Sequence, residues 1–260
     1  LEYLADRAEG VPLLVVGTLG GLRVAASAQD ARDLDALVGQ VAAGQEVARF
    51  VDALQGERVV AEAYVARGRT EGRDPLDAQV RRVDAAAAAV VALPQAAFGA
   101  AATDLEAAAR DRLADLAALR RAVTGSAFPA ERVGAAYTSI IEVFLALQSA
   151  ALTAAPAALL RASADAVTVA EAKEQVRRQH ATVTAVLDGG AVTTGLLDAA
   201  RSAETQTAAA FADLATASSS LRDRWAATVA GADVDTRQRI EQRVLTAMAR
   251  DEPLPTAQAA

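Results

Sequence analysis

The stretch VARFVDALQGERVVAEAYVARG, residues 47–68, decides the fold of this chain. Its apolar side chains recur at steps of three, four and seven residues, which is typical of a helix with one face turned to a core. This core-facing seam consists of Val47, Val51, Leu54, Ala61 and Val65. The position that continues the seam between Leu54 and Ala61 is Arg58, a permanent cation where leucine is expected. Burying a guanidinium costs on the order of several kcal/mol unless an anion or several acceptors meet it, so the sequence predicts a partner opposite Arg58.

The composition of the whole chain predicts an all-α fold. The chain has 260 residues, which allows one large domain or two small ones. Alanine dominates, only 3% of the residues are aromatic, and the alternating β-branched pattern of strands is scarce. Alanine, leucine, arginine and glutamate are strong helix formers, so we expect closely packed helices around a thin core.

Charge and residue usage exclude several classes of function. The net charge is −7 and the acidic residues are interleaved with the cations, which argues against nucleic acid as a partner. The chain has no cysteine and one histidine, so thiol nucleophiles, thiolate metal sites and an HExxH motif are excluded. We find no nucleophile–base pair and no glycine-rich loop after a strand. We therefore expect no enzyme activity in this chain, no cofactor and no metal site.

Three segments follow from the distribution of apolar residues. Residues 1–27 contain an apolar run from Val11 to Leu22, which at twelve residues is shorter than the ~20 that cross a bilayer. The run is either a short buried helix or the outer end of a membrane helix. Residues 28–250 have helical periodicity and form the predicted domain, and residues 251–260 read as a linker.

Within residues 28–250, a weak internal repeat predicts two similar halves. GERVVAEAYVARG at 56–68 aligns with RQHATVTAVLDGG at 178–190, so that Arg58 matches His180. We expect two up-down four-helix bundles that share long helices. The first bundle is centred on 47–155, and the second comprises 156–250 with the N-terminal part of the first long helix.

Four motifs in order resemble the nitrate- and nitrite-sensing domain of bacterial receptors. They are LQGER at 54–58, an aspartate after a Gln/Arg run at Asp84, LAALRRAV at 116–123, and Tyr137 followed by Ile140 and Ile141. The resemblance implies a pair of four-helix bundles that senses a small anion, nitrate or nitrite, and passes a conformational change to an output module outside this chain. The chain is similar in particular to the sensor domains of membrane-anchored histidine kinases of two-component systems. In that setting the domain would be a homodimer outside the cell membrane, held by flanking membrane helices; the alternative is a soluble cytoplasmic domain.

The resemblance and the seams together indicate Arg58 and Arg120 as ligand-binding residues. Arg120 occupies the inward position between Leu116 and Val123. A flat guanidinium can donate two parallel hydrogen bonds to a planar monoanion, and an anion between two facing arginines would remove their repulsion. Further candidates around the ligand are Gln55, Glu57, Asp84 and Tyr137, with His180 as a counterpart in the second bundle.

The alternative is that each arginine pairs with a carboxylate from a neighbouring helix. The acidic candidates are Glu57, Glu62, Asp84 and Asp115. The chain would then be a helical scaffold or dimerisation domain that has lost its ligand. The sensing hypothesis as drawn from the sequence requires two guanidinium groups that face each other, with forks free of protein carboxylates.

Overall fold

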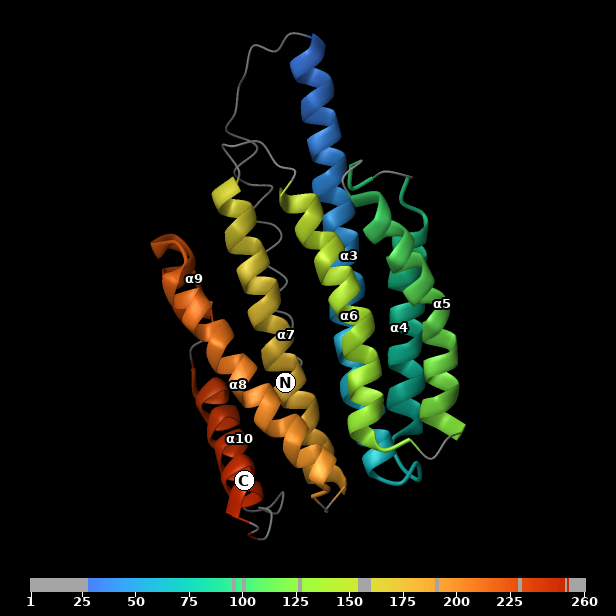
Figure 1. Ribbon diagram of the computed structural model, residues 1–260, viewed down its shortest axis with the longest axis vertical. Coiled ribbons are helices and arrows are strands. Elements are labelled where there is room, and N and C mark those ends of the chain that lie inside the picture. The colour runs from blue at the N-terminus through green and yellow to red at the C-terminus, as the bar shows by residue number, and fades with distance from the viewer. Residues whose placement is uncertain are drawn as a thin grey trace.

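The computed structural model describes residues 28–94, 97–99, 102–125, 128–153, 160–189, 192–228, 231–250 and 252. Within these ranges the regular structure is helical and contains no strand, which confirms the predicted all-α bundle (Figure 1). Residues 1–27 and nearly all of the predicted linker lie outside the described ranges. The predictions of a membrane-helix remnant and of a linker therefore stay predictions.

The described helices follow one another along the chain with short connections. They are α3 (Ala28–Ala66), α4 (Arg73–Val91), α5 (Thr103–Gly125), α6 (Ala130–Thr153), α7 (Leu160–Gly189), α8 (Thr194–Thr216), α9 (Ser219–Thr228) and α10 (Ala232–Arg250).

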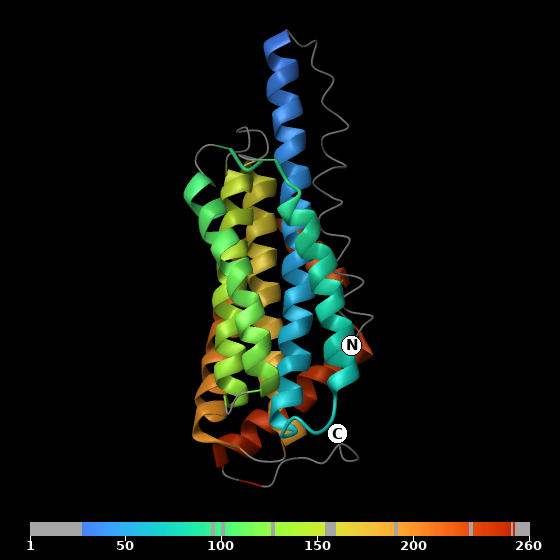
Figure 2. The same cartoon turned by 90° about the vertical axis from the view of Figure 1, so that its right-hand side faces the viewer.

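Helix α3 is the centre of the arrangement. It packs against α4, α6 and α7, while α5 packs against α6. Figures 1 and 2 show that its N-terminal part projects beyond the ends of the neighbouring helices. The α3 seam meets the apolar face of α6, and there Phe50 and Phe144 lie edge to face with ring centroids 4.6 Å apart. Both rings are fully buried, so this contact fixes α3 against α6.

The second half of the chain packs on the other side of α3. Helix α7 contacts α3, α6 and α8, and α10 contacts α7 and α8. The buried positions of α7 include Ala172, Ala181 and Ala185, whose small side chains let neighbouring backbones approach closely. Farther along, Trp225 packs edge to face on Phe211 with centroids 6.2 Å apart, in a small separate cluster.

Residues Ala130–Ala150 of α6 are long and apolar enough to cross a membrane by length and composition. Core packing accounts for that composition, because the seam residues Val133, Tyr137, Ile140 and Phe144 are all buried inside the protein. Helix α6 packs with this buried face against α3, α5 and α7.

Candidate functional site

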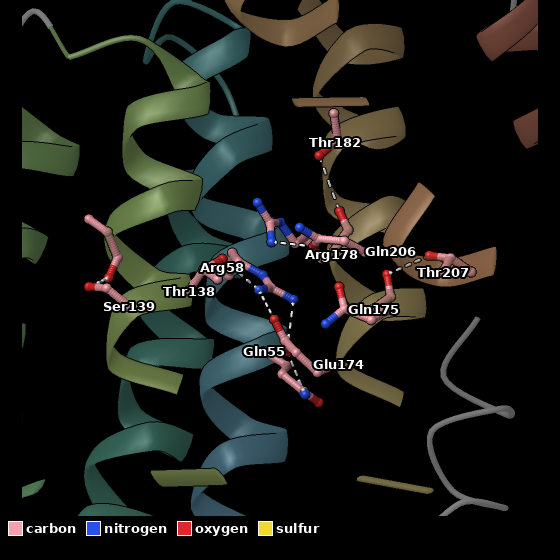
Figure 3. Close-up of polar contacts among 11 residues, drawn as sticks. Gln55, Arg58, Thr138, Ser139, Glu174, Gln175, Arg178, Thr182, Gln206 and Thr207 are labelled. Atoms are coloured by element: carbon pink, nitrogen blue, oxygen red, sulfur yellow. Dashed lines mark hydrogen bonds and ion pairs between the residues drawn. The ribbon is translucent and has the colours of Figure 1, made fainter. Parts of the chain in front are cut away.

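Arg58 lies where α3, α6 and α7 meet, and its side chain is 0% exposed. Its Nη1 donates a hydrogen bond of 2.5 Å to Oε1 of Glu174 on α7, and its Nη2 donates one of 3.2 Å to Oε2. Nη1 also donates to Oγ1 of Thr138 on α6, at 3.0 Å. Figure 3 shows Arg58 between these partners, with its guanidinium turned toward Glu174. The required anion opposite Arg58 is thus a carboxylate of the protein.

A second donor reaches the same carboxylate from one turn earlier on α3. Gln55 Nε2 donates to Glu174 Oε2 at 2.8 Å. Three donors on α3, two from Arg58 and one from Gln55, therefore converge on one planar O–C–O group that is itself only 2% exposed. The network still leaves Arg58 Nε and Gln55 Oε1 without a hydrogen-bond partner among the described residues. An unsatisfied buried polar atom costs about 1–3 kcal/mol.

Arg120 on α5 belongs to a separate cluster. Its Nε and Nη2 each donate a 2.7 Å hydrogen bond to Glu57, and its Nη1 donates to Asp84 on α4 at 2.6 Å. The Tyr137 hydroxyl donates a further bond of 2.7 Å to the fully buried Glu57. Burial alone would lower the pKa of Arg120, but the bonds to both carboxylates raise it instead. Burial and the neighbouring Glu57 charge hold the pKa of Tyr137 well above its usual 10.0.

Glu62, one turn after Arg58 on α3, is buried without a close polar partner. No hydrogen bond or ion pair joins its carboxyl to the described residues, although Arg58 and Arg178 contribute favourable electrostatic interactions. The carboxyl fits into a notch on α6, because a Cβ built at Gly134 would lie 2.4 Å from Glu62 Oε1. Burial raises the pKa of Glu62 from its ordinary 4.5 to about 8, and nearby Glu174 and Glu131 add to that effect.

Comparison with known proteins gives one family match. A family model described as nitrate and nitrite sensing matches residues 49–260, which is most of the chain. The chain belongs to the nitrate- and nitrite-sensing family. No curated protein matches it, and no solved structure does. The family description names sensing, so the chain is a nitrate- and nitrite-sensing sensor domain.

In this nitrate- and nitrite-sensing domain the two arginines do not share one site. Arg58 is held by Glu174 on α7, whereas Arg120 is held by Glu57 and Asp84. Neither fork is free of protein carboxylates, contrary to the facing pair with open forks drawn from the sequence. The physical reason is that adjacent residues on a helix point about 100° apart, so Glu57 and Arg58 face different neighbours.

The other predicted site residues fall into the same two clusters, except His180. Gln55 contacts the Arg58 network, while Glu57, Asp84 and Tyr137 surround Arg120. His180 lies on α7, partly exposed, six residues after Glu174, the residue that does bind Arg58. Sequence reasoning missed Glu174 altogether. No local signal singles it out, because Glu174 shares its helical face with Ala181 and Ala185, and alanine is common at both buried and exposed positions.

A cleft of about 690 Å³ lies between α6, α7 and α8 of the nitrate- and nitrite-sensing domain. Glu174 forms part of its wall, together with Gln175, Gln206 and Ser149. Gln206 is held in place by a 2.7 Å hydrogen bond from Arg178 Nη1. Glu174, which holds Arg58, therefore also forms part of the wall of this cleft.

Proposed function

We propose that this domain is the ligand-binding part of a bacterial signalling receptor, and that nitrate or nitrite binds at Arg58 in place of the Glu174 carboxylate. The proposal joins the family match to the geometry around Arg58. It keeps Arg58 as the principal ligand-binding residue. In place of two facing arginines, it has the Glu174 carboxylate and the external anion compete for Arg58.

The observation that carries the proposal is the shape of the group now bound. A carboxylate is a planar, delocalised O–C–O monoanion, and nitrite is a planar O–N–O monoanion of similar size. Donors from Arg58 and Gln55 already converge on two oxygens in one plane, and the Thr138 hydroxyl lies beside them. Bidentate donation from arginine suits such a group better than a lysine ammonium would.

Exchange of the anion supports a mechanism for signalling through the contact of α3 with α7. In the part of the chain that the structure describes, ion pairs join α3 to α7 at two carboxylates. Glu174 pairs with Arg58, and Asp52 on α3 pairs with Lys173 at 2.7 Å and Arg177 at 3.5 Å. Once an external anion holds Arg58, Glu174 no longer ties α7 to α3. Because the ligand binds only the arrangement with Glu174 displaced, it shifts the population toward that arrangement.

The alternative function is a helical scaffold or dimerisation domain that has lost the ligand. Two observations favour it: each arginine fork is occupied by protein carboxylates, and Glu142, Glu171 and Asp213 give the cleft an acidic lining that disfavours an anion. In this case Glu174 is the permanent partner of Arg58.

Thermal melting in nitrate and nitrite separates the two functions. Sodium chloride at equal ionic strength is the reference, because it reproduces screening without a planar anion. If the proposal holds, nitrate or nitrite raises the melting temperature by mass action. Arg58→Lys, which keeps the charge and loses the fork, abolishes the shift, whereas Arg120→Lys, the matched change in the other cluster, keeps it. Equal melting in all three salts favours the scaffold.

We further propose that the domain acts as a homodimer in a membrane-anchored sensor histidine kinase, with the domain outside the cytoplasm. The support is the resemblance of the motifs and the projection of α3 beyond the other helices, which suits a connection to a flanking segment (Figure 2). Chemical cross-linking of the full-length receptor in membranes tests the dimer. Protease accessibility in spheroplasts tests the side of the membrane, and a protected domain favours the cytoplasmic alternative.

A further inference from the structure

We propose that anion binding at Arg58 is coupled to protonation of Glu62, so that the domain binds its anion together with one proton at alkaline pH. This inference rests on the proposed function and adds a regulatory residue to the same site. It comes from the placement of a buried, unpaired carboxyl beside a site that must accept another negative charge.

The position of the Glu62 carboxyl follows from its place on α3 and from the absence of a side chain at Gly134 on α6. Glu62 follows Arg58 by four residues, so both side chains lie on the same face of α3. On α6, Gly134 provides the notch that receives the carboxyl, at a position where any Cβ would lie 2.4 Å from its Oε1. Among the described residues no donor reaches the carboxyl. A carboxyl buried without donors is more stable neutral than charged.

The charged groups that face Glu62 come from all three helices packed around it. They are Arg58 on α3, Glu131 and the Tyr137 hydroxyl on α6, and Glu174 and Arg178 on α7. With Glu62 neutral, the two arginines balance Glu131 and Glu174. A bound nitrate brings one negative charge to Arg58, while the displaced Glu174 keeps its own charge nearby at the cleft wall, and an ionised Glu62 would add a further negative charge in the same space. Occupancy of the site and ionisation of Glu62 therefore oppose each other.

The direction of the pH dependence follows from linkage. Burial raises the pKa of Glu62 to about 8, so below that pH the free protein already carries the proton and nitrate affinity is constant. Above it the proton must be taken up on binding, and the dissociation constant rises by up to about tenfold per pH unit. Nitrate itself does not titrate in this range, so any slope belongs to the protein.

Isothermal titration calorimetry with sodium nitrate, from about pH 6.5 to about pH 9.5, tests the coupling. Three proteins are compared: the wild type, Glu62→Gln, which mimics the neutral carboxyl, and Glu131→Gln, which removes a neighbouring partly exposed carboxylate. For the wild type we expect constant affinity below about pH 8 and weakening above it, and for Glu62→Gln constant affinity throughout. Glu131→Gln should keep the weakening but begin it at a somewhat lower pH, because Glu131 helps to raise the pKa of Glu62.

A second measurement needs only the wild type. Titrations near pH 8.5, in two buffers with different ionisation enthalpies, give the number of protons taken up per nitrate, for which we expect between about one half and one. Circular dichroism tests whether the variants fold. The number of protons taken up is measured on the wild type, so it is valid even if Glu62→Gln fails to fold.

The outcomes separate this inference from the proposed function. Nitrate binding with no pH slope and no proton uptake overturns the coupling and leaves sensing at Arg58 intact. A slope that persists in Glu62→Gln assigns the proton to another group and overturns the role of Glu62. Absence of nitrate binding at every pH overturns both.

Discussion

Replacing Glu174 by glutamine separates the two functions most sharply, because it removes the competitor and keeps its size. Arg58 is 0% exposed and the Glu174 side chain 2%, so the substitution leaves a buried cation without its counter-charge. Breaking a buried pair by removing one partner costs about 3–5 kcal/mol. The glutamine carbonyl can still accept one bond from Arg58, which places the expected loss near the lower end, at about 3 kcal/mol.

Nitrate should restore most of this loss. In the wild type an incoming anion must displace Glu174, whereas in the variant the donors of Arg58 and Gln55 face an uncharged amide. A ligand present at one hundred times its dissociation constant stabilises the native state by about 2.7 kcal/mol. We therefore expect nitrate to stabilise Glu174→Gln by about 2–3 kcal/mol and to stabilise the wild type by less at the same concentration.

The assay is urea unfolding in sodium nitrate and in sodium chloride at equal ionic strength, followed by circular dichroism. The matched control is Glu171→Gln, an exposed carboxylate on the same helix that lines the same cleft but does not contact Arg58. The control should unfold like the wild type in both salts. If Glu174→Gln has the same free energy of unfolding in nitrate as in chloride, Arg58 does not receive the anion and the reasoning fails.

Three further predictions concern the neighbouring groups. Arg120→Ala should lower the free energy of unfolding by about 3–5 kcal/mol because it strands the buried Glu57, whereas Asp84→Asn, at a side chain 58% exposed, should cost less than about 1 kcal/mol in the same urea assay. Gly134→Ala should cost about 1–2 kcal/mol by crowding Glu62, and a Glu62→Ala background should remove the loss. Without any anion, the raised pKa of Glu62 should make the wild type lose a few kcal/mol relative to Glu62→Gln between about pH 4.5 and about pH 8 and nothing further above, and parallel stability curves would contradict this.

The fold could be predicted from the sequence because its signals are local. Periodic apolar residues mark the long helix around Phe50 and the helix around Phe144, and glycine or proline marks most of the loops. The anomalous Arg58 could be found in the same way, since a cation in an apolar seam is visible without knowing the partner. Its complete burial follows from the positions on either side of it.

The partner of Arg58 could not be predicted in the same way. Glu174 follows Arg58 by 116 residues, and the pairing depends on how α7 is rotated against α3. On α7 the valines at 169, 176 and 183 suggest one core face, but Val176 is only partly buried, and the residues buried completely are Val186 and the alanines at 172, 181 and 185. Alanine gives little pattern because it suits both buried and exposed helix positions. The rotation of α7, and with it the exposure of Glu174, was therefore outside the reach of periodicity.

Helix α3 runs for 39 residues, about 58 Å, and carries Glu57 and Arg58 on consecutive positions. The first is clamped by the α4–α5 side of the molecule and the second by α7. A rotation of α3 about its own axis would move both side chains through the same angle. It would therefore change the ion pair of Arg58 with Glu174 and the ion pair of Glu57 with Arg120 together. A substitution at Arg120 should consequently affect the contact made by Glu174. The double variant at Arg120 and Glu174 should then change the free energy of unfolding by an amount that differs from the sum of the two single changes, although the two side chains do not touch.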